Sequence, residues 1–350
     1  MISQVIAIPR LIESKYDALE GLAHALKNHG FKKILFTVGK GIDELFADKI
    51  KLLVDDKDLI VEGPLVLEML EVSDVAEKAH SLGHYDVIVS MGGGKAIDTG
   101  KYISFLKGIP FVSVPTSISN DGFSSSGASL MIDGKRKSVP AKMPYGVIAD
   151  LSILTTAPKR FYYSGLGDVV SKITASFDWQ FEVNRGIGQL DHFALLTSKK
   201  SVNSVVRLPR PYIEEGLFIK EVVDSLIMSG ISMEVAGSSA PASGSEHLIS
   251  HAMDQIVPGH YLHGIQVGVA TYIMSLAQDY RINRVRTFLT DTGFFDHVKT
   301  LNIPKCVLKD AIKLAPSIKP NRMTTLHDKD YLNKALDVLD TDKILNDILI

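Results

Sequence analysis

Three consecutive glycines, Gly92, Gly93 and Gly94, follow a short apolar run and precede Lys95 and a segment with helical spacing of apolar residues. Glycine has no Cβ, so a turn built from these residues lets backbone N–H groups come close to a bound group. The N-terminus of a helix also attracts anions, because its N–H groups are unpaired and its dipole is positive there. The run indicates a pyrophosphate site. Its spacing differs from G-x-G-x-x-G, and a plain tight turn between strand and helix remains the alternative.

A second group of candidate residues lies in the later part of the chain, at the expected starts of helices. His247 and His251 are four residues apart and would share one face of a helix that begins near Ser245. Gly167-Asp168 and His260-Tyr-Leu-His263 stand at two further predicted helix starts. Two imidazoles and one carboxylate from separate helices match a divalent ion, Zn²⁺ or Fe²⁺, with one coordination position open. Histidines that serve the core or the solvated surface remain the alternative.

The composition limits the class of protein. The chain has 350 residues, of which 45% are hydrophobic, enough for one large or two moderate cores. The net charge of −2 argues against nucleic acid or an acidic membrane surface as the main partner. The single cysteine, Cys306, excludes an internal disulfide and a zinc site built of cysteines. No apolar run reaches membrane-spanning length and the N-terminal residues lack a charged signal segment, so we expect a cytoplasmic protein.

The glycine run must be positioned by a sheet, because the first part of the chain alternates strand-like runs with amphipathic segments. The strand-like runs are 33–38, 59–62, 87–90, 111–115 and 146–150, and helical spacing is found at 73–82 and 95–106. Such alternation predicts a parallel sheet that helices cover on both faces. Residues 128–138 instead predict a hairpin that turns at Asp133-Gly134.

Beyond Pro158 the spacing of apolar residues is almost entirely helical, so we place a domain boundary near residue 155. The predicted fold class is α/β with a second, all-helical part. Residues 1–155 would form a Rossmann-like parallel-sheet domain that binds a dinucleotide. Residues 156–350 would form a helical domain that binds metal and substrate.

Five motifs occur in an order that resembles the superfamily of iron-containing alcohol dehydrogenases, glycerol dehydrogenases and dehydroquinate synthases. They are Gly92–Asp98, Val114–Gly122, Gly167-Asp168, Ser243–His247 and Leu262–Gly264. Within this superfamily, the chain from about Lys32 through Met274 is similar to the sn-glycerol-1-phosphate dehydrogenases. The resemblance implies the dehydroquinate synthase-like fold, in which a Rossmann-like domain precedes a helical one.

The resemblance also implies roles for individual residues. It places the cofactor on Gly92, Gly93, Gly94 and Lys95 at the pyrophosphate, Asp98 in support of the turn, Thr116 and Ser119 further along, and Ser125 near the nicotinamide. It assigns Asp168, His247 and His263 as metal ligands. Asp121 and His251 would face the substrate, and His251 would relay a proton to the product oxygen.

The implied reaction is the reduction of dihydroxyacetone phosphate to sn-glycerol 1-phosphate by NAD(P)H. One divalent ion, Zn²⁺ before Fe²⁺ or Ni²⁺, would polarise the carbonyl group. A glycerol or alcohol dehydrogenase of the same superfamily and a dehydroquinate synthase-like cyclase stay open as alternatives. We expect a homo-oligomer whose partner is this small substrate, without nucleic acid and without a membrane span.

A few positions bear on specificity. Asn120 stands where the family often has a histidine, which alters hydrogen bonding on the substrate side. Gly39 stands where many superfamily members carry an aspartate that repels the 2′-phosphate of NADPH, and Lys40 follows it. We therefore predict that NADPH is accepted within about tenfold of NADH. A glycine that only permits a tight turn is the alternative. Lys135–Lys137, expected on a solvated hairpin, and Arg322 are the basic candidates for a substrate phosphate.

Overall fold

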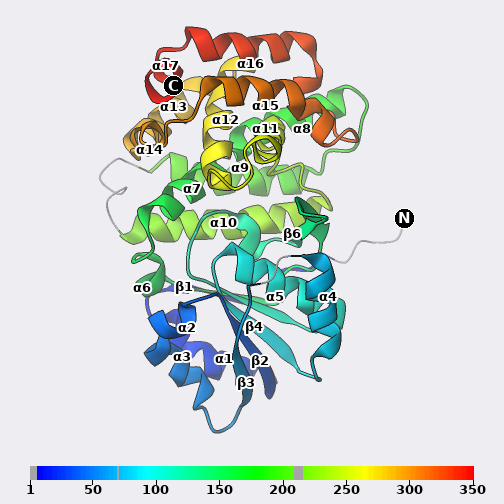
Figure 1. Ribbon diagram of the computed structural model, residues 1–350, viewed down its shortest axis with the longest axis vertical. Helices are drawn as coiled ribbons and strands as arrows, with labels where there is room; N and C mark the ends of the chain where they lie inside the picture. Colours follow the sequence, from blue (N-terminus) through cyan, green and yellow to red (C-terminus); the bar gives the residue numbers. More distant parts are fainter. Residues whose placement is uncertain (1–5, 69–70, 209–215) are drawn as a thin grey trace. The chain divides into compact units, whose positions relative to one another are not determined.

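The computed structural model describes residues 6–68, 71–208 and 216–350, and the chain divides into two compact units, Met1–Ala157 and Pro158–Ile350 (Figure 1). The first five residues of the N-terminal stretch considered above lie outside the described residues. Among the residues that are described, no helix is both long and apolar enough to cross a membrane.

A six-stranded parallel sheet forms the centre of the first unit. In spatial order its strands are β1 (Leu11–Lys15), β8 (Gly146–Asp150), β5 (Phe111–Pro115), β4 (Val87–Gly92), β2 (Lys33–Val38) and β3 (Ile60–Val66). The five predicted strands are confirmed, although β3 extends further than its apolar run. The sequence pattern does not reveal β1, because its segment Leu-Ile-Glu-Ser-Lys carries only two apolar residues and lies at the edge of the sheet.

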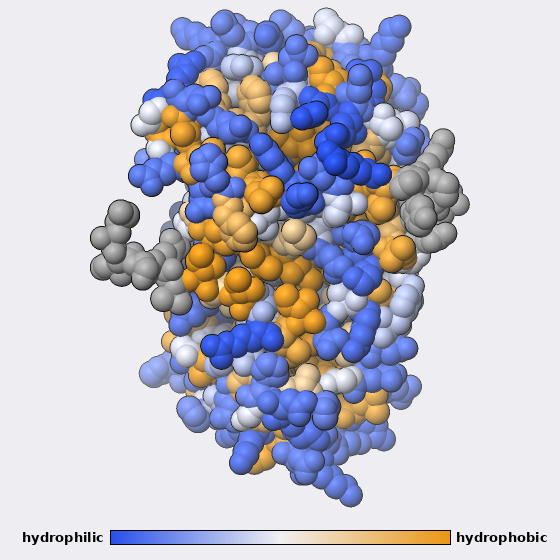
Figure 2. Space-filling model, turned by 180° about the vertical axis from the view of Figure 1, so that it is seen from behind, coloured by the Kyte–Doolittle hydropathy of each residue, from blue (hydrophilic) through white to orange (hydrophobic). Residues whose placement is uncertain are grey.

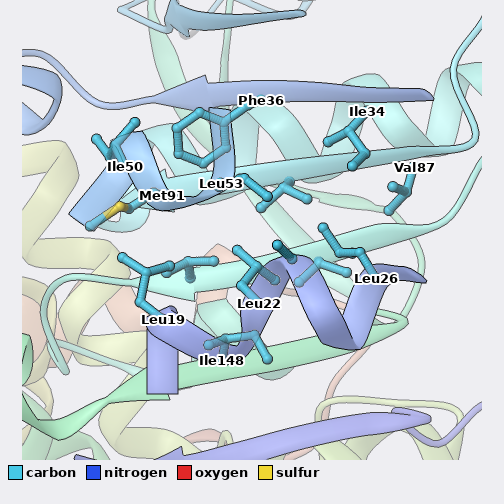
Figure 3. Packing of buried hydrophobic residues seen from close by; sticks show 14 of the residues in the cluster. Leu19, Leu22, Leu26, Ile34, Phe36, Ile50, Leu53, Val87, Met91 and Ile148 are labelled. Atoms are coloured by element: carbon cyan, nitrogen blue, oxygen red, sulfur yellow. The ribbon is translucent and has the colours of Figure 1, made fainter. Parts of the chain in front are cut away.

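Alternate side chains of the strands fill the two faces of the sheet. Phe36, Val87 and Met91 join the hydrophobic core on the face that carries α1 (Leu22–Asn28) and α3 (Ala47–Val54) (Figure 3). Side chains at period two point to the same face of a strand, so the residues between them serve the opposite face. The four central strands are therefore buried on both sides, as their continuous apolar runs predict.

The opposite face carries α5 (Gly94–Lys107), with α4 (Val72–Ser81) packed beside it. A Cβ at Gly100 of α5 would lie 1.8 Å from Oγ of Ser90 on β4, so only glycine allows this helix to approach the strand so closely. The predicted helices at 73–82 and 95–106 and the helical cover of both faces are confirmed. Close packing of α5 on β4 fixes the glycine turn that joins them.

Shorter elements complete the first unit. They are η1 (Ala18–Gly21), α2 (Ile42–Leu45), η2 (Asp121–Ser124), β6 (Gly127–Ile132), β7 (Lys135–Pro140) and α6 (Leu151–Leu154). Strands β6 and β7 form the predicted antiparallel hairpin. Asp133 and Gly134 at its turn both have positive φ angles, 53° and 69°, which is typical of the turns that close two-residue hairpins.

The described residues of the second unit form helices and no strand. Its elements are α7 (Lys159–Val170), α8 (Lys172–Asn184), α9 (His192–Val206), α10 (Gly216–Ala236), α11 (Ser245–Ile256), α12 (His263–Ala277), α13 (Ile282–Asp291), α14 (Phe294–Lys299), α15 (Lys305–Ile318), η4 (Thr325–His327), α16 (Lys329–Thr341) and α17 (Lys343–Ile348). Helix α12 forms the buried centre, because every residue from Gly264 to Ser275 is buried. A helix that is apolar on all sides needs neighbours around it, and α7, α11 and α16 supply them.

Some apolar side chains of the second unit stay at the surface. Phe193 and Leu196 on α9 and Leu217 on α10 are exposed. On the face of the molecule that Figure 2 displays, hydrophobic residues gather in patches among hydrophilic ones. Patches of this kind are typical of surfaces that bind another protein.

Glycines make the contact between α7 and α12. A Cβ at Gly167 would lie 1.9 Å from the carbonyl oxygen of Gly264, and one at Gly264 would lie 1.9 Å from the carbonyl oxygen of Ser164. No side chain fits at either position, although glycine inside a helix costs about 1 kcal/mol relative to alanine. The contact brings the last turn of α7, with Asp168, against the first turn of α12, with His263.

Gly167→Ala is expected to lower the free energy of unfolding by about 1–3 kcal/mol, because the added methyl group forces α7 and α12 apart. Urea unfolding followed by circular dichroism measures the change. Gly21→Ala is the control, because its Cβ meets no atom within 4 Å. The control should keep its stability or gain up to about 1 kcal/mol. Equal stability of Gly167→Ala and the unmodified protein would contradict the role of this contact.

Candidate functional site

The glycine run joins β4 to α5 at the carboxyl edge of the sheet. Strand β4 ends at Gly92, Gly93 is the N-cap of α5, and Gly94 is its first residue. A Cβ at Gly92 would lie 2.9 Å from the Cβ of Ala96 and 3.2 Å from the backbone nitrogen of Gly39, so only glycine fits there. A Cβ at Gly94 would meet no atom within 4 Å. The N-terminal turn of α5 is thus open to a ligand, as an anion site requires.

A small pocket opens beside this turn. It is lined by Gly92, Gly94, Ile97, Pro115, Ser117, Ser119, Asn120 and Phe123. The N–H of Thr116 donates to the carbonyl oxygen of Gly92 at 3.0 Å, which ties the segment after β5 to the end of β4. Parallel strands end at the same edge of a sheet, so two segments distant in sequence form one pocket.

The other predicted cofactor residues lie close to this pocket in sequence but are not part of its lining. Gly93 lies in the turn between β4 and α5, and Thr116 directly follows β5. Lys95 is exposed on the first turn of α5. Ser125 is buried directly after η2. Asp121, predicted to face the substrate, is the first residue of η2 and is half-buried.

Asp98 forms a buried ion pair with Lys101. Their atoms Oδ1 and Nζ lie 3.3 Å apart, and the Lys101 side chain is 1% exposed. The same ammonium group donates to the carbonyl oxygens of Gly122 and Gly127, both at 2.5 Å. Burial lowers the pKa of Lys101 and raises that of Asp98, while each partner opposes the shift of the other. Lys101 therefore ties η2 to the first residue of β6, and these two contacts lie on either side of Ser125.

Asn120 caps the start of η2. Its Oδ1 accepts a hydrogen bond from the N–H of Gly122 at 2.9 Å. A Cβ at Gly122 would lie 2.8 Å from that oxygen, so asparagine and glycine fit together here. Asn120 also lines the pocket. This departure from the family pattern thus has a structural role in shaping the loop.

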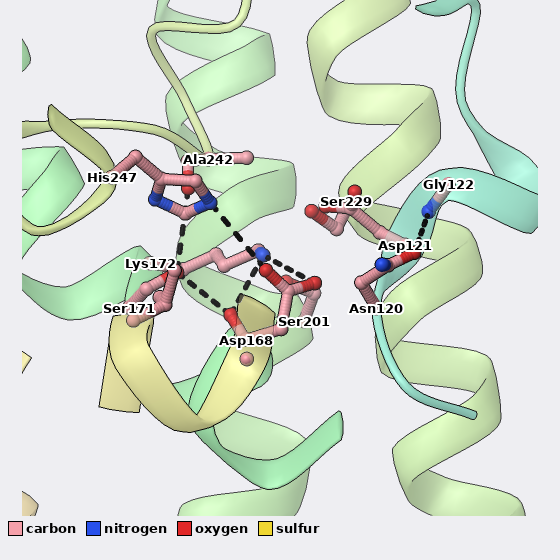
Figure 4. Close-up of polar contacts among 12 residues, drawn as sticks. Asn120, Asp121, Gly122, Asp168, Ser171, Lys172, Ser201, Ser229, Ala242 and His247 are labelled. Carbon is pink, nitrogen blue, oxygen red and sulfur yellow. Dashed lines mark hydrogen bonds and ion pairs between the residues drawn. The ribbon is translucent and has the colours of Figure 1, made fainter. Parts of the chain in front are cut away.

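Asp168, His247 and His263 come together in the second unit. Each offers one ligand atom, and the three atoms lie within 4.8 Å of one another. Nε2 of His247 lies 3.5 Å from Oδ1 of Asp168 (Figure 4). His247 is in the first turn of α11 and His263 is the first residue of α12, in agreement with the predicted helix starts.

The predicted position of Asp168 at a helix start is wrong. The residue lies in the last turn of α7, which begins at Lys159. Gly165 and Gly167 interrupt the apolar pattern and so suggest a break before Asp168. The helix continues through them, because glycine at position 167 is needed for the contact with α12. Packing here overrides the low helix propensity of glycine.

Lys172 sets the charge of Asp168. Its Nζ lies 3.3 Å from Oδ2 of Asp168, and both side chains are 1% exposed. Burial alone would raise the pKa of Asp168, but the charge of Lys172 and the hydrogen bond with His247 hold that pKa below its ordinary value. The carboxylate is therefore ionised at neutral pH and available as an anionic ligand.

Two buried carboxylates fix the first turn of α11. Oε1 of Glu246 lies 2.9 Å from Nδ1 of His247, and Oε2 accepts a hydrogen bond from Thr174. Oδ2 of Asp178 accepts the N–H of Ser245 at 2.6 Å. Burial, followed by the charge of Glu246, raises the pKa of Asp178 to about 6. The ring of His247 thus lies with Nδ1 toward Glu246 and Nε2 toward Asp168. Burial acts to lower its pKa, but its hydrogen bonds with the two carboxylates raise that pKa.

The residues present fit a divalent cation. Nδ1 of His263 lies 3.0 Å from Oγ of Ser250, so Nε2 is the nitrogen that remains to face Asp168 and His247. The group offers one anionic oxygen and two imidazole nitrogens, which is the ligand set of metal sites with an open coordination position. The Nδ1 atom of each ring contacts a neighbouring side chain, as is usual for histidines that bind metal ions.

Comparison with known proteins identifies the family of the chain. A family profile described as "Iron-containing alcohol dehydrogenase" matches residues 13–158. The glycerol-1-phosphate dehydrogenase [NAD(P)+] of Sulfurisphaera tokodaii is 32% identical over 93% of this chain and 93% of its own. That of Methanosarcina mazei is 32% identical over 97% and 96%. The chain belongs to the glycerol-1-phosphate dehydrogenase family.

Solved structures of more distant proteins share the fold of this family member. Glycerol dehydrogenase from Schizosaccharomyces pombe matches with a TM-score of 0.79 and 18% identity over 97% of this chain and 91% of that one. A probable glycerol dehydrogenase from Sinorhizobium meliloti matches with a TM-score of 0.76 and 17% identity over 97% and 98%. The predicted fold class, a parallel-sheet domain followed by a helical one, is thereby confirmed.

His251 lies next to the group of Asp168, His247 and His263 without belonging to it. Its ring stacks on that of His263, with centroids 5.8 Å apart and an interplanar angle of 27°. His260 instead lies in the segment before α12, where its ring contacts Tyr261. His251 is thus the nearer of the two histidines to the ligand group, one helical turn from His247.

The basic residues considered for a substrate phosphate have other contacts. Nε of Arg322 lies 3.3 Å from Oε1 of Glu182, and Nη2 donates to the carbonyl oxygen of Ser243. Lys135–Lys137 are exposed on β7, as expected for a solvated hairpin. Lys40, a candidate for the 2′-phosphate of NADPH, forms an exposed ion pair with Glu68 at 3.2 Å. The role of Arg322 within the second unit is to hold the segment before η4 against α8.

Several residues that shape the site carry little sequence signal. The residues concerned are charged and lie close in sequence to predicted site residues: Lys101, Glu246 and Lys172. Charged side chains are more often exposed to solvent than buried. The spacing of Lys101 from Asp98 and of Lys172 from Asp168, three and four residues on one helix, is the signal that indicates ion pairs. Their complete burial follows from the packing of neighbouring segments.

Lys101→Met is expected to lower the free energy of unfolding by about 3–5 kcal/mol, because it leaves Asp98 buried without its cation. Lys107→Met on the same helix is the matched control. Lys107 also donates to two carbonyl oxygens, those of Ala79 and Leu82, but it is half-buried and has no carboxylate partner in those bonds. The control should lose about 1 kcal/mol. Equal losses of the free energy of unfolding in urea would contradict a larger contribution from the buried ion pair.

Proposed function

We propose that the protein reduces dihydroxyacetone phosphate to sn-glycerol 1-phosphate with a hydride from NADH or NADPH. Relatives named glycerol-1-phosphate dehydrogenase [NAD(P)+], similar along most of the chain, support the substrate and the cofactor class. The observation that carries the proposal is the buried group of Asp168, His247 and His263. Reduction of a ketone builds negative charge on oxygen, so the reaction needs a fixed Lewis acid there.

The ion that we propose for this group is Zn²⁺, with Fe²⁺ and Ni²⁺ as alternatives. When bound, a divalent ion acts as a Lewis acid toward the carbonyl oxygen of the substrate. Asp168 contributes a negative charge that Lys172 keeps ionised, and the two histidines contribute neutral nitrogens. His251 holds a proton for the oxygen that becomes the new hydroxyl group, and Asp121 orients the substrate.

The first unit is proposed as the dinucleotide-binding domain and the second as the metal- and substrate-binding domain. The open turn at the start of α5 supports this division. The residues proposed to bind the cofactor are Gly92, Gly93, Gly94 and Lys95 at the pyrophosphate, Thr116 and Ser119 further along, and Ser125 near the nicotinamide. Asp98 supports the turn through its ion pair with Lys101.

Use of both cofactors is proposed from Gly39. Its position beside Gly92 leaves no carboxylate to repel the 2′-phosphate of NADPH, and its N–H donates to Met91 within the sheet. We further propose a homo-oligomer, which the exposed apolar side chains of Phe193, Leu196 and Leu217 support. A cytoplasmic location stays a prediction.

An assay with purified, Zn²⁺-loaded protein tests the substrate and the cofactor together. Loss of nicotinamide absorbance is expected when dihydroxyacetone phosphate is added to NADPH, with slower turnover of dihydroxyacetone. The kcat/KM for NADPH should be within about tenfold of that for NADH, about 1.4 kcal/mol in transition-state free energy. Faster turnover of the unphosphorylated ketone would contradict the proposed substrate. Rejection of NADPH by about a thousandfold would contradict the interpretation of Gly39.

A pair of histidine variants tests the metal ligands. His263→Ala is expected to lose the bound ion and the activity, because the remaining two ligands do not complete the site. His251→Ala is the matched variant, since its ring lies against that of His263. It should keep the ion but lose rate by about 10²–10⁴-fold, the usual effect of a general acid. Elemental analysis and steady-state kinetics measure both; full metal content in His263→Ala, or metal loss in His251→Ala, would mean a different ligand set.

A further inference from the structure

A chain of hydrogen bonds runs from His263 away from the metal-binding group. Nδ1 of His263 lies 3.0 Å from Oγ of Ser250, which donates to Oε1 of Gln266 at 2.6 Å. Nε2 of Gln266 in turn donates to Oδ1 of Asp254 at 3.0 Å. Ser250 and Asp254 are four residues apart on α11, and His263 and Gln266 are three apart on α12. The four side chains thus connect two packed helices, and Ser250 and Gln266 are completely buried.

The proton positions in this chain follow from the carboxylate at its end. A carboxylate oxygen only accepts, so the amide nitrogen of Gln266 faces Asp254 and the amide oxygen faces Ser250. The hydroxyl group of Ser250 has one proton, which it donates to that oxygen. Its oxygen must then accept from Nδ1–H of His263. A neutral imidazole carries one N–H, so Nε2 of His263 keeps its lone pair.

We propose that Asp254 and Gln266 are positioning residues that hold His263 in the tautomer able to bind a metal ion. The proposal rests on the proposed function, because it assigns a role in the metal site. The Nδ1 atoms of the two histidine ligands are held in different ways. Glu246 contacts Nδ1 of His247 directly, whereas Asp254 acts on Nδ1 of His263 through two intervening side chains.

Asp254 prevents this series of hydrogen bonds from reversing its donor-to-acceptor direction. Without the carboxylate, the amide group of Gln266 is free to turn and to present its NH₂ to Ser250. Ser250 would then accept from Gln266 and donate its proton to Nδ1 of His263. The imidazole would carry its proton on Nε2, where it cannot bind a cation without first losing it.

The decisive variants are Asp254→Ala and the double variant Asp254→Ala/Gln266→Glu. Asp254→Ala leaves all three ligands in place and is expected to weaken Zn²⁺ binding by about 10–100-fold, the usual effect of losing a residue that supports a ligand. In the double variant, a carboxylate at position 266 can only accept from Ser250. The direction of the chain is then fixed without Asp254, so most of the Zn²⁺ affinity should return. Gln255→Ala, at an exposed neighbour on α11, is the control and should bind Zn²⁺ normally.

Two measurements on the whole protein, neither of which uses the substrate, decide the question. Competition with a chromophoric chelator gives the Zn²⁺ affinity, and ¹⁵N chemical shifts of the His263 ring in the metal-free protein report which nitrogen carries the proton. Thermal unfolding of the metal-free variants separates these effects from stability. An Asp254→Ala protein that is less stable but keeps the Nδ1–H tautomer and its Zn²⁺ affinity would overturn the proposal, as would a double variant that binds no better than Asp254→Ala. Absence of Zn²⁺ binding by the unmodified protein would instead overturn the proposed function.

Discussion

The close contact between α7 and α12 is the constraint on which the group of Asp168, His247 and His263 depends. A Cβ at Gly167 would meet the backbone of Gly264, and a Cβ at Gly264 would meet the backbone of Ser164, so neither position admits one. Asp168 and His263 each follow or precede one of these glycines, so their side chains emerge at the point of closest approach. The ligand atoms can lie within 4.8 Å of one another because the backbones that carry them are in contact. The low helix propensity of glycine is the cost of this geometry.

Buried charges then determine what the assembled side chains can do. Lys172 keeps Asp168 ionised inside the helical unit, and Glu246 contacts Nδ1 of His247, so that Nε2 is turned toward Asp168. In the first unit the buried pair of Asp98 and Lys101 anchors the loop after β5. Ion pairs of this kind add little to stability when compared with apolar side chains, and losing one partner is costly. Their value here is that each fixes the position of a segment on which a predicted site residue lies.

Local patterns were sufficient wherever a segment is buried in a regular way. Continuous apolar runs predict β2, β4, β5 and β8, since each is covered on both faces, and Asp133-Gly134 predicts the hairpin because the turn needs positive φ angles. The same reasoning misses β1, whose partner in the sheet comes from a distant part of the chain. It also misplaces Asp168. Glycine has a low helix propensity and so suggests the end of a helix, whereas Gly167 lies inside one because close packing there admits no side chain.

The sequence by itself determined the types of residue at the site, the glycine turn before α5 and the helices that begin near His247 and His263. Each of these depends on residues within a few positions of one another, so its physical cause is visible in a short segment. Only the tertiary structure decided that Asp168 faces two imidazoles, and which nitrogen of each ring is turned toward it. Those facts depend on hydrogen bonds and contacts between helices, such as the one from His263 to Ser250. The position of a proton on a ring is set by neighbours in space, which the order of residues along the chain does not show.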